Sequence, residues 1–247
     1  MVNSLLQRLL AGLFPDYCSL CGLRSQRDLP LCLNCERELQ ANTACCHRCA
    51  IPLPPAPLTG PAPAPQKVCG SCQQTPPPYQ RVVAPWLYCE RLAYLIQRWK
   101  FHGESRLTPL LASLWLQQVD EPGPVDLIVP IPLHWRRLWQ RGFNQSELLA
   151  RQLRSHSPGL AAARLDHRST RRSRPTRAQS GMGAVQRAAN LRDAFTVNRR
   201  YDNLRIAIVD DVFTTGATAA ALALTLRNAG AGHIDVWCLA RTPAPGA

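Results

Sequence analysis

The fold of this chain is decided by one stretch, Ile206-Ala207-Ile208-Val209-Asp210-Asp211-Val212-Phe213-Thr214-Thr215-Gly216-Ala217-Thr218. The apolar run over residues 205–209 predicts a buried strand. Asp210 and Asp211 follow it directly, so we expect their carboxylates at the edge of a sheet rather than inside its core. A turn of threonines and glycine then opens a helix that is predicted over residues 217–229.

This turn offers donors for an anion, and the acidic pair restricts which anion fits. Backbone N–H groups at a helix N-terminus and threonine hydroxyls form a cradle for phosphate, and Gly216 lets the backbone approach it closely. The carboxylates of Asp210 and Asp211 would repel a second phosphate but accept hydrogen bonds from hydroxyl groups. The stretch therefore predicts a ligand with a phosphate beside hydroxyls, which is a sugar phosphate.

Three other phosphate-related motifs fit the stretch less well. A Walker motif needs G-x-x-x-x-G-K-[ST], and a dinucleotide site needs G-x-G-x-x-G after an early strand; the stretch has neither pattern. A receiver-type acidic pair would lie near the start of its domain with a phosphate-accepting aspartate downstream, and only Asp235 follows here.

Segments typical of strands and helices alternate on both sides of this stretch. We expect further strands over residues 82–88, 125–132, 194–197 and 234–239, and helices over 91–100, 107–119 and from about 145 to 155. Residues 164–177 include six arginines, few apolar residues and no periodicity, so we expect a mobile surface segment there. The alternation predicts an α/β domain over residues 79–243 with an open, mostly parallel sheet, in which ligands bind at the carboxyl ends of strands.

Eight of the eleven cysteines form four C-x-x-C pairs, which are Cys18 with Cys21, Cys32 with Cys35, Cys46 with Cys49, and Cys69 with Cys72. Each pair turns two thiolates toward one point, as half of a tetrahedral zinc site requires. Sequential pairing gives two four-cysteine sites, and the spacing also allows an interleaved arrangement. Four thiolates leave no open coordination position, so both zinc ions are expected to be structural. The module would span residues 18–75, with a proline-rich insertion at 52–65.

Other residues near the cysteine pairs carry further expectations. Gly22 and Gly70 stand where a cysteine turn needs a positive φ or a close backbone approach. Cys45 is a spare thiol or an alternative ligand, whereas Cys89 and Cys238 lie in strand-like runs and are expected to be buried. A redox role for the pairs is the alternative to zinc binding.

The formal net charge is +13, and it comes from arginine, because Lys67 and Lys100 are the only lysines. Arginine matches phosphate geometry, so the surplus favours polyanionic partners such as nucleic acid, nucleotides or pyrophosphate. No apolar run approaches the ~20 residues that a membrane span needs, and the pattern of a secretion signal is not recognisable. We expect a cytoplasmic protein in which residues 1–17 form an amphipathic helix.

The sequence VDDVFTTGAT at residues 209–218 resembles the motif with which type I phosphoribosyltransferases bind phosphoribosyl pyrophosphate (PRPP). The resemblance implies that Asp210 and Asp211 bind the ribose 2′- and 3′-hydroxyls and are the catalytic residues. It also implies a PRPP-binding set that continues with Val212, Phe213, Thr214, Thr215, Gly216, Ala217 and Thr218, the last five of which would hold the 5-phosphate.

The whole chain resembles the ComF family, and in particular its GntX-type DNA-utilisation proteins. In that family a double zinc ribbon precedes a phosphoribosyltransferase-like domain. The resemblance rests further on K-F-x-G at 100–103, V-P-I-P-L at 129–133, R-G-F-N-Q at 141–145, and Gln179 with Arg187 and Asn190. The chain departs from the family pattern at the proline-rich insertion in its second ribbon. The implied fold is the open sheet of type I phosphoribosyltransferases.

The same resemblance implies the remaining parts of a PRPP site. A pyrophosphate-binding loop is expected at residues 130–141, with Arg137, Arg141 and Gly142 as its binding residues. A flexible lid is expected within residues 164–179, including Arg174, Arg177 and Gln179. Mg²⁺ bound with PRPP would neutralise the departing pyrophosphate, and closure of the lid would exclude water.

Two functions are compatible with these features. The first is an enzyme that transfers the phosphoribosyl group of PRPP to an acceptor that the sequence does not identify, with release of pyrophosphate. The second is a protein that handles nucleic acid, in which the arginines of 164–177 and 136–141 follow the phosphates of single-stranded DNA. Trp135 and Trp139 would then stack on bases or, alternatively, pack against the core. The family's association with uptake and use of external DNA favours the second function, with DNA-uptake or DNA-processing proteins as further partners.

Overall fold

The centre of the fold is a six-stranded sheet whose described strands pair in parallel. This computed structural model describes residues 17–54, 67–119, 121–173 and 194–243. The strands are β1 (Arg81–Val83), β2 (Trp86–Leu87), β3 (Leu127–Pro130), β4 (Arg164–Leu165), β7 (Arg205–Phe213) and β8 (His233–Arg241). Their order is β1-β8-β7-β3-β4, with β2 also paired to β8, so β7 lies in the middle of the sheet. A separate antiparallel pair consists of β5 (Thr170–Arg172) and β6 (Phe195–Val197).

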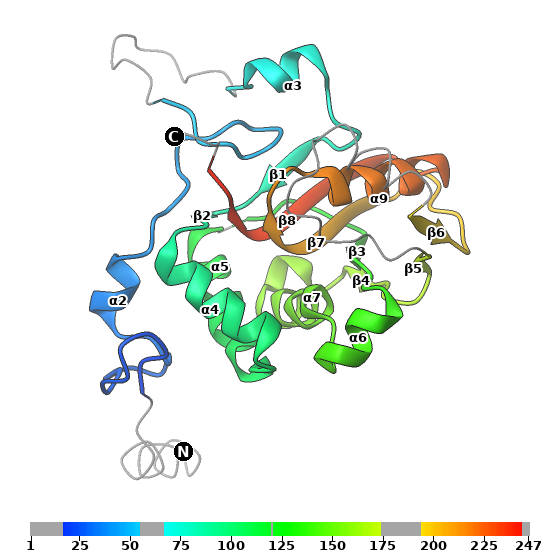
Figure 1. The fold of residues 1–247 in the computed structure, drawn as a ribbon. Coiled ribbons are helices and arrows are strands. Elements are labelled where there is room, and N and C mark those ends of the chain that lie inside the picture. The colour runs from blue at the N-terminus through cyan, green and yellow to red at the C-terminus, as the bar shows by residue number, and fades with distance from the viewer. Residues whose placement is uncertain (1–16, 55–66, 120, 174–193, 244–247) are drawn as a thin grey trace.

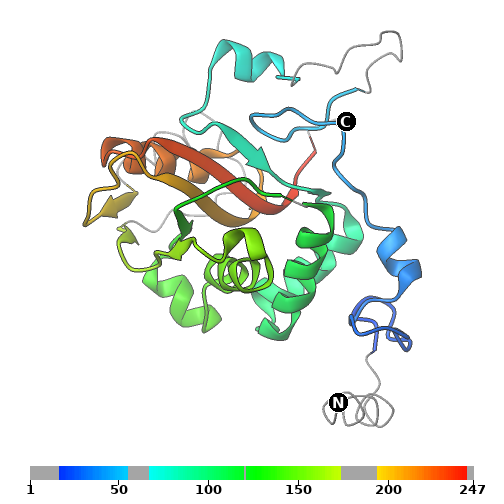
Figure 2. The same ribbon diagram turned by 180° about the vertical axis from the view of Figure 1, so that it is seen from behind.

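Helices cover both faces of this sheet, as Figure 1 and the reverse view in Figure 2 show. The helices α4 (Glu90–Phe101), α5 (Thr108–Gln118) and α7 (Gln145–His156) lie on one face, and α9 (Ala217–Asn228) lies on the other. The short helix α6 (Trp135–Arg141) follows β3, and 3-10 turns span Ser105–Leu107 and Pro158–Leu160. The short helices α2 (Leu33–Arg37) and α3 (Gly70–Gln74) belong to the cysteine-rich segment. The open, mostly parallel α/β sheet predicted from the sequence is confirmed.

The central strand β7 is buried on both sides, which explains its continuous apolar run. Ala207 and Val209 belong to the apolar cluster that contains α4, α5 and α7, whereas Ile206 and Ile208 belong to the cluster that contains α9. Successive side chains of a strand point to opposite faces, so each layer of helices buries half of the strand. Each fully buried isoleucine contributes on the order of 1.5–3 kcal/mol to folding. Because β7 is the central strand, its carboxyl end lies in the middle of the sheet edge at which open α/β folds bind ligands.

The strand β7 is longer than the strand predicted over residues 205–209. It continues through Asp210 and Asp211 to Phe213, because β8 runs beside it as far as Arg241 and extends the hydrogen-bonded ladder. The acidic pair therefore lies within the last part of the strand rather than beyond its end. The expectation that Asp210 and Asp211 follow the end of the strand is therefore wrong.

Other boundaries also differ from the sequence-based expectation. The strand predicted over residues 82–88 is divided into β1 and β2 at Ala84 and Pro85, where proline has no N–H to donate to a ladder. Cys89 is not in a strand but precedes the first turn of α4 as its N-cap. The described part of 164–177 contains β4 and β5, so it is not an irregular surface stretch. The helices predicted over 91–100, 107–119, 145–155 and 217–229 are confirmed within one or two residues at each end.

Two further expectations cannot be compared with the structure. Residues 1–16 of the helix predicted over 1–17 and most of the proline-rich insertion lie outside the described residues. None of the helices in the described ranges combines the length and the apolar character that crossing a bilayer requires.

Candidate functional site

The acidic pair lies at the carboxyl end of β7, and the end of α4 reaches it from another part of the chain. The Nζ atom of Lys100 lies 2.7 Å from Oδ1 of Asp211, and these side chains are 17% and 15% exposed. Because water screens a sheltered ion pair less than a surface pair, this contact is stronger than an ordinary surface salt bridge. It fixes the last turn of α4 against the sheet edge.

Asp210 is held by neutral hydrogen-bond donors. Its Oδ1 atom accepts a hydrogen bond from the backbone N–H of Asp211 at 2.9 Å and one from the hydroxyl of Ser146 at 3.3 Å. Ser146 lies in the first turn of α7. Burial and then the neighbouring charge of Asp211 raise the pKa of Asp210 to about 7, although Lys100 and these hydrogen bonds oppose the rise. Asp210 is therefore partly protonated near neutral pH.

The turn after β7 exposes its threonines and buries the residues before them. Thr214 and Thr215 are exposed, whereas the side chains of Val212 and Phe213 lie in the core, so these two can offer a ligand only main-chain atoms. Gly216 is the N-cap of α9 and has a φ of +75°. A Cβ atom there would lie 2.4 Å from Cζ of Phe213, so the position requires glycine. The first N–H groups of α9 open onto this turn, as an anion cradle requires.

Two arginines, Arg141 of α6 and Arg172 of β5, lie close enough to the acidic pair to interact with its charge. Burial lowers the pKa of Arg141, and the charge of Asp211 partly offsets that effect. Burial likewise lowers the pKa of Arg172, and the charge of Asp210 partly offsets it. Arg137 repels both of these guanidinium groups. Of the two arginines predicted from the sequence, Arg141 therefore lies within range of the charge of Asp211, and Arg137 lies within range of the charges of Arg141 and Arg172.

The predicted pyrophosphate loop at residues 130–141 is only partly a loop. The helix α6 occupies residues 135–141, and the ring of His134 caps it by accepting a hydrogen bond from the backbone N–H of Arg136 at 3.3 Å. Gly142 ends the helix with a φ of +78°, and open space surrounds the position of its missing Cβ. This glycine is therefore explained by its left-handed backbone rather than by a close neighbour.

A cavity of about 390 Å³ opens between α6 and β5, next to the end of β3. Its walls include Trp135, Glu147, Thr170 and Arg171. Thr170 is 3% exposed, and its hydroxyl oxygen has no hydrogen-bond partner among the described residues. Trp135 and Trp139 are 65% and 85% exposed, so they do not pack against the core.

The eight paired cysteines come together in two groups of four, in sequential order. Within each group all sulfur atoms lie within 4.8 Å of one another; the groups are Cys18, Cys21, Cys32 and Cys35, and Cys46, Cys49, Cys69 and Cys72. The Sγ atoms of Cys21 and Cys32 are 3.8 Å apart, and those of Cys49 and Cys69 are 3.7 Å apart. Two thiolates bound to one tetrahedral zinc ion at ~2.3 Å lie about 3.8 Å from each other. Both groups therefore fit a structural zinc ion.

In each group, backbone N–H groups favour the thiolate form of one cysteine. Burial raises the pKa of the Cys46 thiol, but the backbone N–H groups of Cys69, Cys49 and Arg48 outweigh that effect and lower it to about 7. In the first group, backbone N–H groups likewise outweigh burial and lower the pKa of Cys18 to about 6. A thiolate is the form that binds metal, so each group contains one cysteine whose lowered pKa favours that form, whereas burial raises the pKa of Cys35 and of Cys72.

The other residues for which the cysteine pattern gave an expectation agree with it only in part. Gly22 has the positive φ expected of a cysteine turn, at +75°, whereas Gly70 begins α3 without one, because a helical start needs no left-handed residue. Cys45 lies outside both groups, and burial raises the pKa of its thiol. Cys238 is buried in β8 as expected.

Sequence reasoning missed three residues of the site. Lys100 and Ser146 lie in or next to the motifs at 100–103 and 141–145, so those motifs were the available signal, although neither residue had an assigned role. Arg172 belongs to the arginine-rich stretch, where nothing in the pattern distinguishes it from its neighbours. The expected lid residues Arg174, Arg177 and Gln179 lie outside the described residues.

Together, these features define a class of protein in which two four-cysteine ribbons accompany an open parallel α/β domain with an acidic pair at the end of its central strand. A family model for the double zinc ribbon domain matches residues 9–73. Among solved structures, the purine phosphoribosyltransferase from Pyrococcus horikoshii Ot3 aligns with 57% of this chain and 75% of that chain, at a TM-score of 0.30 and 18% identity.

Similarity to relatives extends over most of the chain. The chain is 37% identical to the DNA utilization protein YhgH of Salmonella typhi, over 92% of this chain and 98% of that protein. It is 34% identical to the protein of the same name from Escherichia coli K12, with the same coverage. It is 32% identical to competence protein F of Haemophilus influenzae, over 85% of this chain and 90% of that protein. The chain therefore belongs to the family of the DNA utilization protein YhgH and competence protein F, which confirms the resemblance drawn from its motifs.

Proposed function

We propose that this protein serves the use or uptake of exogenous DNA and that its C-terminal domain binds PRPP or a related phosphoribosyl ligand. The observation that carries the proposal is the position of Asp210 and Asp211 in the last part of β7, two residues before the turn that leads into α9. Relatives named for DNA utilization and competence supply the biological setting. We also infer a cytoplasmic location, because cysteines that hold zinc rather than form disulfides suit a reducing compartment.

The ribose of the ligand would lie against the acidic pair. Ribose hydroxyls donate hydrogen bonds, and ionised carboxylates accept them with charge-assisted strength. The positive charge of Lys100, which lies 2.7 Å from Asp211, lowers the pKa of Asp210 and so favours its ionised form. The hydroxyl of Ser146 helps to orient Asp210 through its contact with Oδ1.

The 5-phosphate would lie in the turn that follows the pair. Thr214 and Thr215 expose their hydroxyls there, and Gly216 presents no side chain that would keep a phosphate away from the backbone. Ala217 and Thr218 begin α9, so their N–H groups point out of the helix end toward the same space. Only Val212 and Phe213 separate the acidic pair from the cradle in the chain, which suits a ribose and a phosphate that are covalently joined.

The pyrophosphate group of PRPP would lie toward α6. Arg137 and Arg141 are the arginines that we assign to it, with Gly142 ending the helix behind them. Arg172 of β5 adds a third positive charge to this region. Mg²⁺ bound with PRPP would neutralise part of the diphosphate charge.

Transfer of the phosphoribosyl group is the alternative to binding alone. In that reaction a lone pair of the acceptor forms a bond to ribose C1 while the bond from C1 to pyrophosphate breaks, and pyrophosphate leaves with the electron pair. A pyrophosphate-release assay with PRPP, Mg²⁺ and a panel of bases, amines and oligonucleotides separates the two functions. Release that depends on one acceptor would establish transfer, and the absence of release with every acceptor would favour a binding role.

A calorimetric series tests the assignment of the acidic pair. We expect PRPP with Mg²⁺ to bind more tightly than ribose 5-phosphate, because the arginines contact only the former. We expect 2-deoxyribose 5-phosphate to bind about tenfold more weakly than ribose 5-phosphate, because it lacks one hydrogen bond to a charged acceptor. Equal affinity for the two sugar phosphates would argue against a role for the carboxylates in hydroxyl recognition.

Binding of single-stranded DNA is a second proposal, and the exposure of α6 supports it. Trp135 and Trp139 extend from one face of this helix into solvent, and the guanidinium of Arg136 lies 5.2 Å from the centroid of the Trp135 ring. Arg171 and the buried hydroxyl of Thr170 line the cavity beside them. Bases stack on exposed aromatic rings while arginines contact the phosphates, and an unsatisfied hydroxyl offers a hydrogen bond to a base edge.

Fluorescence anisotropy with a labelled oligonucleotide tests this second proposal. Trp139→Ala should weaken binding about fivefold or more, because stacking on one base contributes about 1–3 kcal/mol. Leu224→Ala on α9 is a control, since Leu224 is also an exposed large side chain. Arg171→Gln should reduce the salt dependence of binding, whereas Arg200→Gln, whose guanidinium pairs with Asp202, should not. A flat salt response of the wild-type protein would contradict the proposal.

A further inference from the structure

We infer that the second ribbon, which contains Cys46, Cys49, Cys69 and Cys72, determines the shape of the phosphate turn, which is the turn at residues 214–216 after β7. Arg241 joins the backbone of Cys49 to the turn after β7, so the occupancy of the second cysteine group by metal controls the shape of this turn. The functional consequence rests on the proposed function and is specific: PRPP binding requires metal at the second group but not at the first.

Arg241 makes this connection with one guanidinium group. It is the last residue of β8 and is 8% exposed. Its Nε atom donates a hydrogen bond to the carbonyl oxygen of Cys49 at 3.0 Å. Its Nη1 atom donates to the carbonyl oxygens of Phe213 at 3.1 Å and Thr214 at 2.7 Å. The planar, multi-donor guanidinium can span these separate carbonyls, which a lysine ammonium could not do with the same geometry.

The rings of Phe213 and Tyr79 pack beside Arg241 and couple the position of its guanidinium to that of the turn. The guanidinium of Arg241 lies 5.3 Å from the centroid of the Phe213 ring, and the ring of Tyr79 meets Phe213 edge-on with centroids 6.2 Å apart. On the other side, a Cβ at Gly216 would lie 2.4 Å from Phe213 and 3.2 Å from the hydroxyl of Tyr79. Because packed interiors leave little free volume, Phe213 cannot shift toward the turn without displacing the backbone of Gly216.

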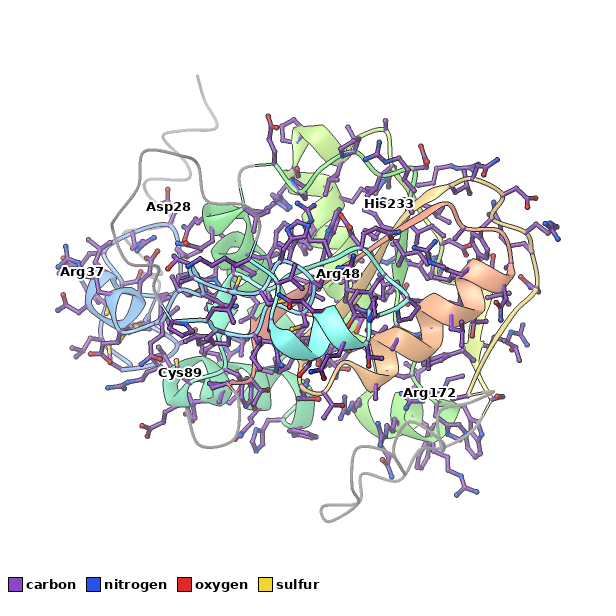
Figure 3. All side chains as sticks on the ribbon, turned by 90° about the horizontal axis from the view of Figure 1, so that it is seen from above. Asp28, Arg37, Arg48, Cys89, Arg172 and His233 are labelled. Carbon is purple, nitrogen blue, oxygen red and sulfur yellow. The ribbon has the colours of Figure 1, made fainter. Side chains whose placement is uncertain are left out.

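The second ribbon is seated on the sheet beside this turn. The side-chain amide of Asn42 donates hydrogen bonds to the carbonyl oxygens of Ala50 at 2.8 Å and Ala84 at 3.0 Å, which ties the ribbon to the end of β1. Ala50 is fully buried in the apolar cluster on the α9 face, and Cys49 packs against the same cluster. Figure 3 shows Arg48 of this ribbon over the body of the α/β domain.

The first ribbon contacts a different part of the molecule. Its buried cysteines Cys18 and Cys35 belong to the apolar cluster on the opposite face of the sheet. The guanidinium of Arg98 on α4 donates a hydrogen bond to the carbonyl oxygen of Ser19 at 2.6 Å. In Figure 3, Arg37 of this ribbon lies at the end of the molecule, away from Arg172. The two cysteine groups therefore pack on opposite faces of the sheet, and it is the second that Arg241 joins to the phosphate turn.

Charge gives a second reason for the coupling. The hydrogen-bond acceptors of Arg241 among the described residues are backbone carbonyl oxygens, including that of Thr242, and no carboxylate of those residues forms an ion pair with it. One Zn²⁺ with four thiolates has a net charge of about −2, so a filled second group would be the compensating charge for this buried cation. Without the metal site Arg241 would be a buried charge that lacks its partner, which favours movement of the guanidinium toward water.

The test compares matched variants of the full-length protein. Hydrogen exchange is measured on peptides that cover residues 213–217, and zinc content and PRPP binding are measured on the same samples. Cys72→Ser removes a buried ligand of the second group, and Cys35→Ser removes the corresponding ligand of the first. Arg241→Gln leaves all eight ligands in place, so it remains informative if Cys72→Ser does not fold. Arg154→Gln is its control, because Arg154 also donates to a backbone carbonyl, that of Ala163 at 2.7 Å.

We expect exchange in the 213–217 peptides to be at least about tenfold faster in Cys72→Ser and Arg241→Gln, and unchanged in Cys35→Ser and Arg154→Gln. PRPP affinity should fall in the same two variants. Unchanged exchange in Arg241→Gln, or equal effects of Cys72→Ser and Cys35→Ser, would overturn the inference. If exchange responds as expected but the wild-type protein binds no PRPP, the coupling stands and the proposed function fails, so the two outcomes are distinguishable.

Discussion

The Nζ atom of Lys100 lies 2.7 Å from Oδ1 of Asp211, and this contact joins the last turn of α4 to the carboxyl end of β7. Lys100 thus supplies a positive charge beside two neighbouring carboxylates, which repel each other and would otherwise need a metal ion or a proton there. A ribose that binds there can accept hydrogen bonds from the ammonium group and donate them to the carboxylates, because a hydroxyl does both.

Lys100→Met should raise the pKa of Asp210 above its present value of about 7, because Lys100 is a positive neighbour that holds this pKa down. The variant should also lose about 1–3 kcal/mol of stability, since Asp211 loses its charged partner. Carboxyl-carbon NMR titration measures the pKa, and Lys67→Met, at the only other lysine, is the control. An Asp210 pKa that stays the same or falls would show that Lys100 does not act on the pair.

Asp210→Asn should stabilise the protein at pH 8 and have little effect at pH 4. The pKa of Asp210 in the folded protein is about 7, above the ~4 of an exposed aspartate, so the folded state binds more protons than the unfolded state between these values. The contribution of Asp210 to the free energy of unfolding therefore falls as the pH rises from about 4 through 7, by at most about 4 kcal/mol. The side chain of asparagine does not titrate in this range, so the variant does not undergo this loss.

Chemical denaturation at both pH values measures this difference. Asp202→Asn is the matched control, because Asp202 is an exposed aspartate paired with Arg200. If Asp210→Asn changes stability equally at pH 4 and pH 8, the raised pKa is wrong.

Gly216→Ala should destabilise the protein by about 1–3 kcal/mol and abolish binding of sugar phosphates. The substitution forces a side chain into left-handed backbone and toward a ring atom of Phe213 that would lie 2.4 Å away. Gly159→Ala is the control, because its Cβ would meet an ordinary contact at 4.0 Å and its φ is not positive. Thermal unfolding and calorimetry check the two effects, and wild-type affinity in Gly216→Ala would exclude the turn as a phosphate site.

Zinc content should be about two equivalents per chain and about one in the double variant Cys18→Ser with Cys21→Ser. Native mass spectrometry counts the bound ions directly. A strong chelator should unfold the two ribbons, since metal supplies most of the folding energy of such small modules. Ribbons that remain folded without metal would contradict the assignment of Cys18, Cys21, Cys32, Cys35, Cys46, Cys49, Cys69 and Cys72 as structural ligands.

The parts of the site that sequence could predict are those that are local in the chain. The order of strand, acidic pair, turn and helix is written in consecutive residues, and each C-x-x-C pair needs only one turn of backbone. The position of Gly216 was also predictable, because a positive φ beside a phosphate cradle favours glycine.

Residues that act across the fold could not be predicted in the same way. Lys100 reaches Asp211 from α4, and Arg241 reaches Cys49 from β8, so their roles depend on packing between distant segments. The length of β7 depends on its neighbour, because a strand continues for as long as a partner strand pairs with it. The sequential grouping of the cysteines was one of two arrangements that the spacing allowed, and the fold decided between them.

The central claim is that the end of β7 and the turn after it bind PRPP. Isothermal calorimetry with PRPP and Mg²⁺, on the wild-type protein and on the double variant Asp210→Asn with Asp211→Asn, tests it most directly. The account predicts saturable binding by the wild-type protein and at least about a hundredfold loss of affinity in the folded double variant, because two charged hydrogen-bond acceptors are removed. Absence of binding by the zinc-loaded wild-type protein, or equal binding by the double variant, would contradict it.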